Sequence, residues 1–313
     1  MTIEIISVEQ YKLFFQGNNF IFMSPEFTEL NKYKVDKIIY MLIKDSKPRF
    51  IACFGIKENK VFCPFSAPFG MIIPLKNDTS LECYFAMIKA IDAYMLQENY
   101  KYIQYTLPPA FYNDNAVNIL IYALTSNGYL MKHIDINYHM DLKKMGVNNY
   151  IDLIHYNARK NLSISLKAGL RLDQCLRDED KLMAYEIIRL NRESKGYPIR
   201  MSYEQVSNTI RIVDHEFFVV KKGDKPIAAA VVFHVNKDVA QVIYWGDIPG
   251  YSQDKPINYL SYQLILYYRQ SGYRYLDIGP SSECGVPNIG LCNFKQSIGC
   301  DITCKFTFEK YIG

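Results

Sequence analysis

The stretch YRYLDIGPSSECGVPNIGLCNFKQSIGC, residues 273–300, combines a strand, an irregular loop and a short helix. Its apolar strand ends at Asp277 and Ile278, which are followed by glycine, proline and two serines. A strand that delivers a carboxylate and small polar residues to its carboxyl end can form one edge of a binding site. The same residues also form simple turns, so both interpretations stay open at this point.

The first half of the chain repeats the order of elements around this stretch. In each half a helical pattern leads to a strand, a second helix and a final strand. The elements are expected at residues 81–98, 100–109, 115–126 and 128–142 in the first half and at residues 257–270, 273–282, 288–297 and 299–311 in the second. Antiparallel strands precede both sets, with a hairpin turn at KKGDKP, residues 221–226. The repeat predicts a duplicated mixed α/β fold.

The pattern breaks at MGVNN, residues 145–149. We therefore predict an N-terminal domain over residues 1–148 and a C-terminal domain over residues 149–313. Each domain is expected to hold its own sheet, and in the second the middle strand is expected to border a wedge. One continuous sheet would count against this interpretation.

The composition excludes several classes of protein. Of the 313 residues, 49% are hydrophobic and 22% are charged, which is typical of a soluble protein long enough for two domains. A net charge of +4 does not by itself indicate nucleic acid, and the longest apolar run, residues 227–233, is too short to cross a membrane. No signal peptide is recognisable. We expect a cytoplasmic protein without a transmembrane segment or a DNA partner.

The eight cysteines contain no CxxC pair. This pattern argues against a structural metal and favours free thiols in a reducing compartment. The five histidines do not cluster in sequence with an acid or a nucleophile. We therefore expect no metal site.

A basic helix is predicted from about Tyr150 to Ala168, with Gly169 ending it. One face would carry the mostly apolar residues Ile151, Ile154, Ala158, Leu162 and Ser165. The basic residues of the helix are Arg159, Lys160 and Lys167. They could form a stripe that binds phosphate, or simply complement the carboxyl end of the helix.

Ten short motifs occur along the chain. In the second half they are HYNARKNLSISLKAGL (155–170), LRLDQC (170–175), LNRESKG (190–196), VIYWGD (242–247), GYRYLDIGPSS (272–282) and GLCNFKQSIG (290–299), and in the first half they are SPEF (24–27), CPFSAPFG (63–70), LPPAFY (107–112) and INYHMDL (136–142). Each motif is loose, but their order from about Ser24 to Phe308 resembles the Fem-type aminoacyltransferases. It is equally similar to the wider GNAT-like acyltransferases.

The resemblance implies two tandem GNAT-like acyl-CoA N-acyltransferase domains, with the active-site cleft in the second. It implies transfer of an acyl or aminoacyl group to an amine of a cell-envelope or glycan-linked acceptor in a bacterium. In the Fem branch the donor is aminoacyl-tRNA and the acceptor is a peptidoglycan precursor, whereas other branches use acyl-CoA. The donor, acyl-CoA or aminoacyl-tRNA, stays open, as does the oligomeric state.

The resemblance also implies functional residues. Asp277 is the candidate catalytic residue, which would position or polarise the attacking amine. The candidate substrate-binding residues, several of them taken from the motifs and the basic helix, are Arg159, Lys160, Lys167, Arg192, Tyr244, Trp245, Ser281, Phe294 and Lys295. The plain alternatives are that Asp277 forms a turn and that Lys295 is a solvated helix residue.

One departure from the GNAT pattern bears on the donor. A standard GNAT domain has an R/Q-x-x-G-x-G/A loop, whose backbone N–H groups hold the pyrophosphate of CoA. The matching region reads GDIPGYSQDKPINYL, with Gly246 and Gly250 but without that motif. This departure argues against ordinary use of acetyl-CoA. The alternative is a non-catalytic ligand-binding or RNA-binding protein on the same scaffold.

Overall fold

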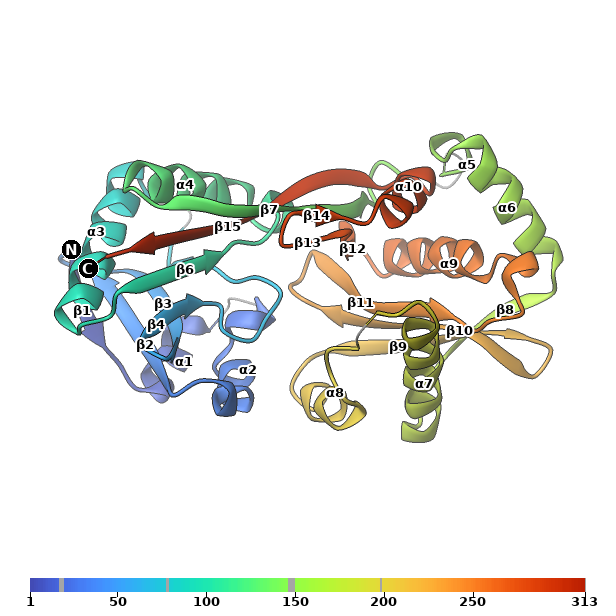
Figure 1. The fold of residues 1–313 in the computed structure, drawn as a ribbon, viewed down its shortest axis with the longest axis horizontal. Coiled ribbons are helices and arrows are strands. Elements are labelled where there is room, and N and C mark those ends of the chain that lie inside the picture. Colours follow the sequence, from blue (N-terminus) through green and yellow to red (C-terminus); the bar gives the residue numbers. More distant parts are fainter. Residues whose placement is uncertain (17–19, 77–78, 146–149, 198, 313) are drawn as a thin grey trace. The chain divides into compact units, whose positions relative to one another are not determined.

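The computed structural model describes residues 1–313 except 17–19, 77–78, 146–149, 198 and 313 (Figure 1). The chain divides into two compact units made of non-contiguous segments. Unit 1 contains Met1–Ile136, Ser282–Val286 and Thr303–Gly313, and unit 2 contains Asn137–Ser281 and Pro287–Ile302. The sequence division at residues 148 and 149 therefore stays a prediction, since both units also take up segments from beyond it.

The elements of unit 1 form a sheet with helices packed on it. They are β1 (Thr2–Ile5), α1 (Val8–Phe15), α2 (Pro25–Leu30), β2 (Lys37–Lys44), β3 (Pro48–Lys57), β4 (Lys60–Cys63), β5 (Ile73–Pro74), α3 (Leu81–Gln97), β6 (Tyr102–Thr106) and α4 (Asp114–Ser126). The order in the sheet is β1-β2-β3-β4-β6, and the parallel pair is β4 with β6. Capping by Ser7 and Asn113 sets the starts of α1 and α4.

Unit 2 has the corresponding arrangement. Its elements are α5 (Tyr150–Leu153), α6 (Tyr156–Lys167), β8 (Leu170–Gln174), α7 (Asp178–Ser194), α8 (Tyr203–Thr209), β9 (His215–Lys222), β10 (Lys225–His234), β11 (Val239–Asp247), α9 (Pro256–Gln270), β12 (Tyr275–Pro280) and α10 (Ile289–Ser297), and the short hairpin strands β13 (Ser282–Glu283) and β14 (Val286–Pro287) lie between β12 and α10. The sheet order is β12-β11-β10-β9-β8, and β11 runs parallel to β12. The predicted mixed α/β class is confirmed.

Helices cover both faces of the sheet in unit 2. Residues 227–232 of β10 are completely buried, which requires cover on both sides because successive side chains of a strand point to opposite faces. The helices that contact β10 and β11 are α7 and α9, and they lie on opposite sides of these strands (Figure 1). The core of this unit is therefore a three-layer arrangement.

The last strands of the two halves are exchanged. β7 (Leu130–Asp141) ends the first half but pairs with β12, from Asp141 opposite Tyr275 to Asn137 opposite Pro280. β15 (Asp301–Tyr311) ends the second half but pairs with β6. The strand order is one path, so the expectation of two separate sheets is wrong. With 12 and 11 residues, β7 and β15 are about twice as long as β6 and β12, and each takes part in both units.

The predicted basic helix is interrupted. It forms α5 and α6, because His155 has extended backbone angles of φ −64° and ψ 153°. Gly169 follows α6 with a φ of +67°, as expected for a residue that ends a helix. Ala158, Leu162 and Ser165 are buried as predicted, whereas Ile151 belongs to α5 and is exposed.

The partly buried carboxylate of Glu216 in β9 leads to a pH prediction. Burial alone would raise its pKa, but hydrogen bonds from His234 and Tyr268 hold the pKa of Glu216 below its ordinary value of 4.5. A lowered pKa stabilises the folded state above about pH 4.5, and this contribution is lost as the pH falls. Glu216→Gln should lower the unfolding free energy by about 1–2 kcal/mol at pH 7. Urea unfolding between pH 7 and 3 should show the difference from wild type shrinking below pH 4.5, and a constant difference would contradict this account.

Candidate active site

The parallel strands β11 and β12 pair over only three positions. The pairs run from Val239 opposite Tyr275 to Gln241 opposite Asp277. β11 then continues to Asp247 and β12 to Pro280, and across these described residues no further pairing joins the two strands. A bulge in β11, where its register with β10 shifts, lies just beyond. We call the point after Gln241 and Asp277 the strand split.

Asp277 lies at the strand split and is completely buried. Its carboxylate accepts hydrogen bonds from Asn137 Nδ2 at 2.9 Å, Gln241 Nε2 at 2.9 Å and the backbone N–H of Gly279 at 2.8 Å. These donors come from β7, β11 and β12. The carboxylate therefore joins three strands at the point where parallel pairing ends.

Lys295 of α10 holds the free end of β12. Its side chain is 2% exposed, and its Nζ donates to the carbonyl oxygens of Ile278, Gly279 and Pro280 at 3.0, 2.8 and 3.0 Å. Burial lowers the pKa of Lys295 to about 8, although the neighbouring Cys300 and Asp277 raise it. Within this unit Lys295 is buried, and the sequence alternative of a solvated residue does not describe it.

Aromatic side chains join α10 to the other strand. Trp245 of β11 meets Phe294 of α10 edge to face, with ring centroids 6.1 Å apart. Tyr244 is buried, and the guanidinium of Arg192 from α7 lies 5.0 Å from the centre of its ring. Burial lowers the pKa of Arg192, and the charge of Arg200 lowers it further. Two guanidinium groups near each other favour an anion between or beside them.

These contacts define a small frame, which we call the site frame. It consists of the end of β11 (Tyr244 and Trp245), the end of β12 (278–280) and α10 (Phe294 and Lys295). Arg192 lies against the β11 side. The printed contacts thus link five of the nine predicted substrate-binding residues along the ends of β11 and β12, which separate just after Asp277.

Ser281 follows β12 and is also buried. Its backbone accepts a hydrogen bond from the N–H of Asn288 at 2.8 Å. Within the part of the chain that the structure describes, its Oγ has no hydrogen-bond partner. A buried hydroxyl without a partner is uncommon and marks a place where water or a ligand can bind.

Sequence reasoning missed the clamp on β11 by Asn191 of α7. Its Nδ2 donates to the carbonyl oxygen of Asp247 at 2.7 Å and to the Asp247 carboxylate at 2.9 Å. Gly246 lets the helix approach, since an added Cβ would lie 2.7 Å from the Cβ of Asn191. The only sequence signal was the presence of the two motifs LNRESKG and VIYWGD, which are 45 or more residues apart.

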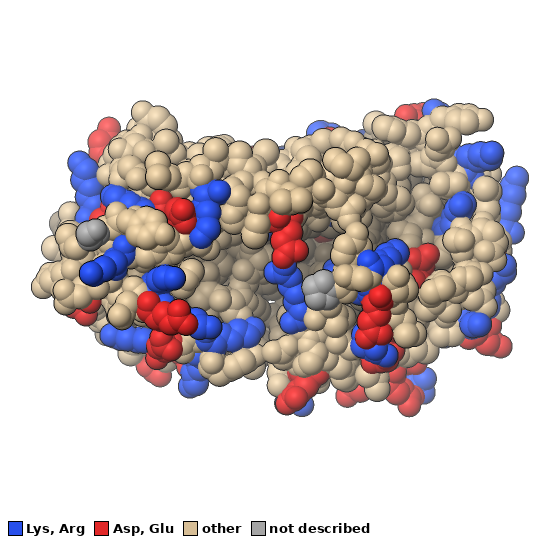
Figure 2. Space-filling view, in the orientation of Figure 1, with Lys and Arg blue, Asp and Glu red and all other residues tan. Residues whose placement is uncertain are grey.

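The remaining candidates lie elsewhere. Arg159, Lys160 and Lys167 are exposed on α6, with Lys160 and Lys167 opposite its buried residues and Arg159 on its flank. Figure 2 shows Lys and Arg side chains gathered over α6. No contact of the described residues connects these three cations with the site frame, and their predicted role in substrate binding stays a prediction.

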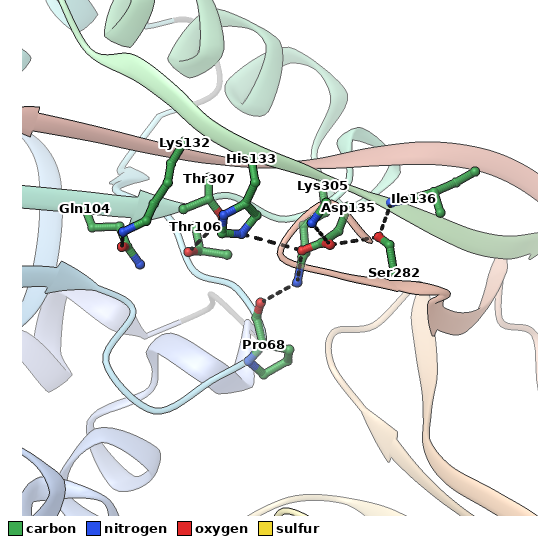
Figure 3. A network of polar contacts seen from close by, with 11 residues as sticks. Pro68, Gln104, Thr106, Lys132, His133, Asp135, Ile136, Ser282, Lys305 and Thr307 are labelled. Atoms are coloured by element: carbon green, nitrogen blue, oxygen red, sulfur yellow. Dashed lines mark hydrogen bonds and ion pairs between the residues drawn. The ribbon is translucent and has the colours of Figure 1, made fainter. Parts of the chain in front are cut away.

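A polar network in unit 1 fixes the segment that precedes α10 (Figure 3). Asp135 of β7 is 4% exposed and accepts hydrogen bonds from Ser282 Oγ at 2.7 Å and from the N–H of Gly285 at 3.1 Å. Lys305 Nζ and His133 Nε2 each lie 3.7 Å from its other oxygen. Ser282 Oγ also accepts from the N–H of Ile136 at 2.8 Å. Sequence offered no signal for this anchor, because Asp135 and Ser282 are 147 residues apart.

Comparisons with known proteins bear on this fold. No family model and no curated protein matches the sequence. Among solved structures, FemX matches with a TM-score of 0.72 and 14% identity, over 99% of this chain and 97% of that one. The C-terminal domain of a putative lysylphosphatidylglycerol synthetase from Agrobacterium fabrum matches with a TM-score of 0.61 and 10% identity, over 97% and 92%.

A tandem GNAT protein from the clavulanic acid biosynthesis pathway has a TM-score of 0.53 and 9% identity, with 88% of this chain and 83% of that chain covered. The chain has the fold of FemX and of tandem GNAT proteins. This confirms the fold that the motifs implied, a FemAB-like and GNAT-like arrangement. At such identities the likeness extends to the fold and not to a substrate.

The described residues lack two kinds of feature. None of their helices is long and apolar enough to cross a membrane. No group of three or more His, Cys, Asp or Glu side chains among them could hold a metal ion.

The close packing at Gly246 generates a stability prediction. Gly246→Ala should lower the unfolding free energy by about 1–3 kcal/mol, because the new Cβ would overlap Asn191, which is held by two hydrogen bonds. The matched control is Gly290→Ala in α10, where the nearest atom would be 3.6 Å away and alanine favours the helix. Urea unfolding measures both variants. Equal behaviour of the two would show that α7 is not clamped there.

The buried amine of Lys295 generates a second pH prediction. Its pKa is about 8 in the folded state and about 10.5 when unperturbed, so the folded protein loses this proton first. Folding stability from this group should therefore rise between pH 8 and pH 10.5, by up to roughly 3 kcal/mol. The difference in unfolding free energy between wild type and Lys295→Met should change with pH in that window. A difference independent of pH would mean that Lys295 is solvated.

Proposed function

We propose that this chain is an N-acyltransferase that moves an acyl or aminoacyl group to an amine. The donor would be a thioester or a charged tRNA, and the acceptor would be an amine of a cell-envelope precursor or a glycan. One observation carries the proposal: β11 and β12 part after three paired positions, and α10 bridges their free ends through Phe294 and Lys295.

The strand split supplies unpaired backbone groups. Past Gln241, the N–H and C=O groups of β11 that face β12 have no partner on that strand among the described residues. Such an edge can bind an extended donor through main-chain hydrogen bonds. An N–H group fixed beside the reacting carbonyl would stabilise the negative charge that develops on its oxygen during acyl transfer.

In this proposal Lys295 and Asp277 act as positioning residues. Asp277 is completely buried and engaged by three donors, so it would fix the geometry of the split rather than take the proton of the amine. Lys295 would hold residues 278–280 at their distance from β11 and add positive charge beside the forming oxyanion. Alignment of donor and acceptor can supply a large part of the rate without a strong general base.

The Arg192 and Tyr244 pair would bind a phosphate of a substrate. The guanidinium is half-buried over the ring, and a second guanidinium, Arg200, lies near enough to lower its pKa. Phosphate is present in CoA, in tRNA and in nucleotide-linked precursors. The pair therefore fits the proposed substrates without distinguishing between them.

The comparisons support the proposal at the level of the fold. FemX covers nearly the whole chain, and a tandem GNAT protein matches over most of it. Another match is described as a putative lysylphosphatidylglycerol synthetase, a name that refers to an aminoacyl-lipid product. An aminoacyl donor is therefore compatible with this fold.

The test is thermal stabilisation of the protein by acetyl-CoA, by aminoacyl-tRNA and by a nucleotide-linked peptidoglycan precursor. We expect one donor to raise the melting temperature in a saturable way. Trp245→Ala and Arg192→Ala should each weaken that binding about tenfold or more. The first variant removes an aromatic side chain of the site frame, and the second removes the positive charge beside it. Lys237→Ala, an exposed turn residue with no ion pair among the described residues, is the matched control.

A direct transfer assay follows with the donor that binds. Radiolabelled acyl or aminoacyl group should appear on the acceptor amine, and Lys295→Met should reduce kcat by about 100-fold. Binding of a donor without transfer to any offered amine would favour the non-catalytic alternative. Binding of RNA alone, with an affinity that falls steeply with salt, would favour an RNA-binding protein.

A further inference from the structure

The segment from α5 to α6 exposes several large apolar side chains. Their exposed fractions are Ile151 51%, Leu153 46%, Tyr156 73%, Ile164 38% and Leu166 49%. Single exposed apolar residues are normal on a protein surface and need no explanation. Five exposed apolar side chains within 16 residues, on two consecutive helices, indicate a surface that contacts a partner.

The same segment carries cations without acidic partners. Arg159, Lys160 and Lys167 are exposed, and α6 contains no Asp or Glu. Among the described residues none of the three forms an ion pair. The neighbouring α7 behaves differently, since Arg189 pairs there with Glu186 and Glu193. The charge of α6 is therefore available to an external anion.

The helical period places these two kinds of side chain on one face. At 100° per residue, Tyr156, Lys160 and Lys167 lie along the line opposite the buried Ala158, Leu162 and Ser165. Leu166 and Arg159 lie on one side of that line and Ile164 on the other. The buried side packs against α9 and β8. Tyr156 and Ile164 thus share the outward face with Lys160 and Lys167, and Leu166 and Arg159 are exposed on the flank of the same helix.

This combination distinguishes between possible partners. An RNA backbone would bind the three cations, but it offers no apolar surface to Ile164 and Leu166. A membrane that contains anionic phospholipid offers both: its phosphates pair with Lys and Arg, and the boundary between headgroups and acyl chains accepts aliphatic and tyrosine side chains. A cationic face also excludes a neutral membrane as the preferred partner.

We propose that the outward face of α5 and α6 docks this protein on a membrane containing anionic phospholipid. The protein would bind peripherally. The cations of α6 would be attracted by the lipid phosphates, and Tyr156, Ile164 and Leu166 would enter the boundary between headgroups and acyl chains. The proposal rests on the exposed apolar residues of α5 and α6 and on the positive charge of α6, since the one charged residue of α5 is Asp152, and it stands whether or not the chain catalyses acyl transfer.

The experiment is co-sedimentation of the whole chain with vesicles. Vesicles of phosphatidylglycerol and phosphatidylcholine should bind the protein at least about tenfold better than vesicles of phosphatidylcholine alone. Lys160→Glu/Lys167→Glu should reduce binding to the anionic vesicles by at least about tenfold. The matched control is Lys89→Glu/Lys237→Glu, which makes the same change of net charge at two exposed lysines outside α5 and α6.

A second pair of variants tests the apolar contribution. Leu166→Ser should weaken vesicle binding about threefold or more, and Leu96→Ser, at an equally exposed leucine of α3, should leave it unchanged. Tyr156→Trp should give a blue-shifted fluorescence on anionic vesicles, against the constant signal of Trp245. Circular dichroism and melting temperature establish that each variant is folded.

Three outcomes overturn the proposal. One is equal sedimentation with both kinds of vesicle or with neither. Another is an equal loss in the charge variants and their controls, which would indicate attraction by net charge alone. The third is an unchanged Leu166→Ser variant together with a short RNA that displaces the protein from vesicles, which would identify the α6 cations as an RNA site.

Discussion

The carboxylate of Asp277 is the contact on which the geometry of unit 2 depends. It is completely buried, and its cost of desolvation is offset by three hydrogen bonds from three different strands. Gln241 and Asn137 hold it from either side, and Gly279 turns the chain just after it. Because a buried carboxylate cannot lose these donors without a large penalty, the place where β11 and β12 separate is determined.

Two further contacts keep the separated strands apart. Lys295 ties the carbonyl groups at the end of β12 to α10, and the pair of Trp245 and Phe294 ties the end of β11 to the same helix. Because α10 contacts the ends of both β11 and β12, it holds the two strands at a defined separation beyond the strand split. Burying an ammonium group costs desolvation free energy even when three carbonyls accept its hydrogen bonds, and the same burial lowers the pKa of Lys295. Its presence is easier to explain by a site than by stability.

The course of the chain adds a second constraint. The last strand of each half is long enough to take part in both units, so β7 supplies Asn137 to the strand split and Asp135 to the anchor of Ser282. Residues 135 and 137 point to the same side of a strand, since side chains alternate. One strand thus holds both ends of the segment that follows Asp277.

The resemblance of its motifs implied several residues of the site frame. The sequence by itself determined most of the elements and their repetition in the two halves. These follow from local patterns: apolar periodicity, glycine and proline at turns, and motifs such as GLCNFKQSIG, which together implied the fold that the comparisons confirmed. Only the tertiary structure decided which strands pair. The exchange of β7 and β15 was not predictable, because the partner of a strand depends on long-range contacts that its own residues do not record.

Dependence on long-range contacts also explains why the roles of some residues could not be predicted from the sequence. A Lys in a short helix has no local sign of burial, and Lys295 became a buried donor only because residues 278–280 reach it. Asp135 and Asn191 act through partners 147 and 56 residues away, which no local pattern records. Local sequence determines what a segment can form, whereas burial and partnership depend on where the rest of the chain lies.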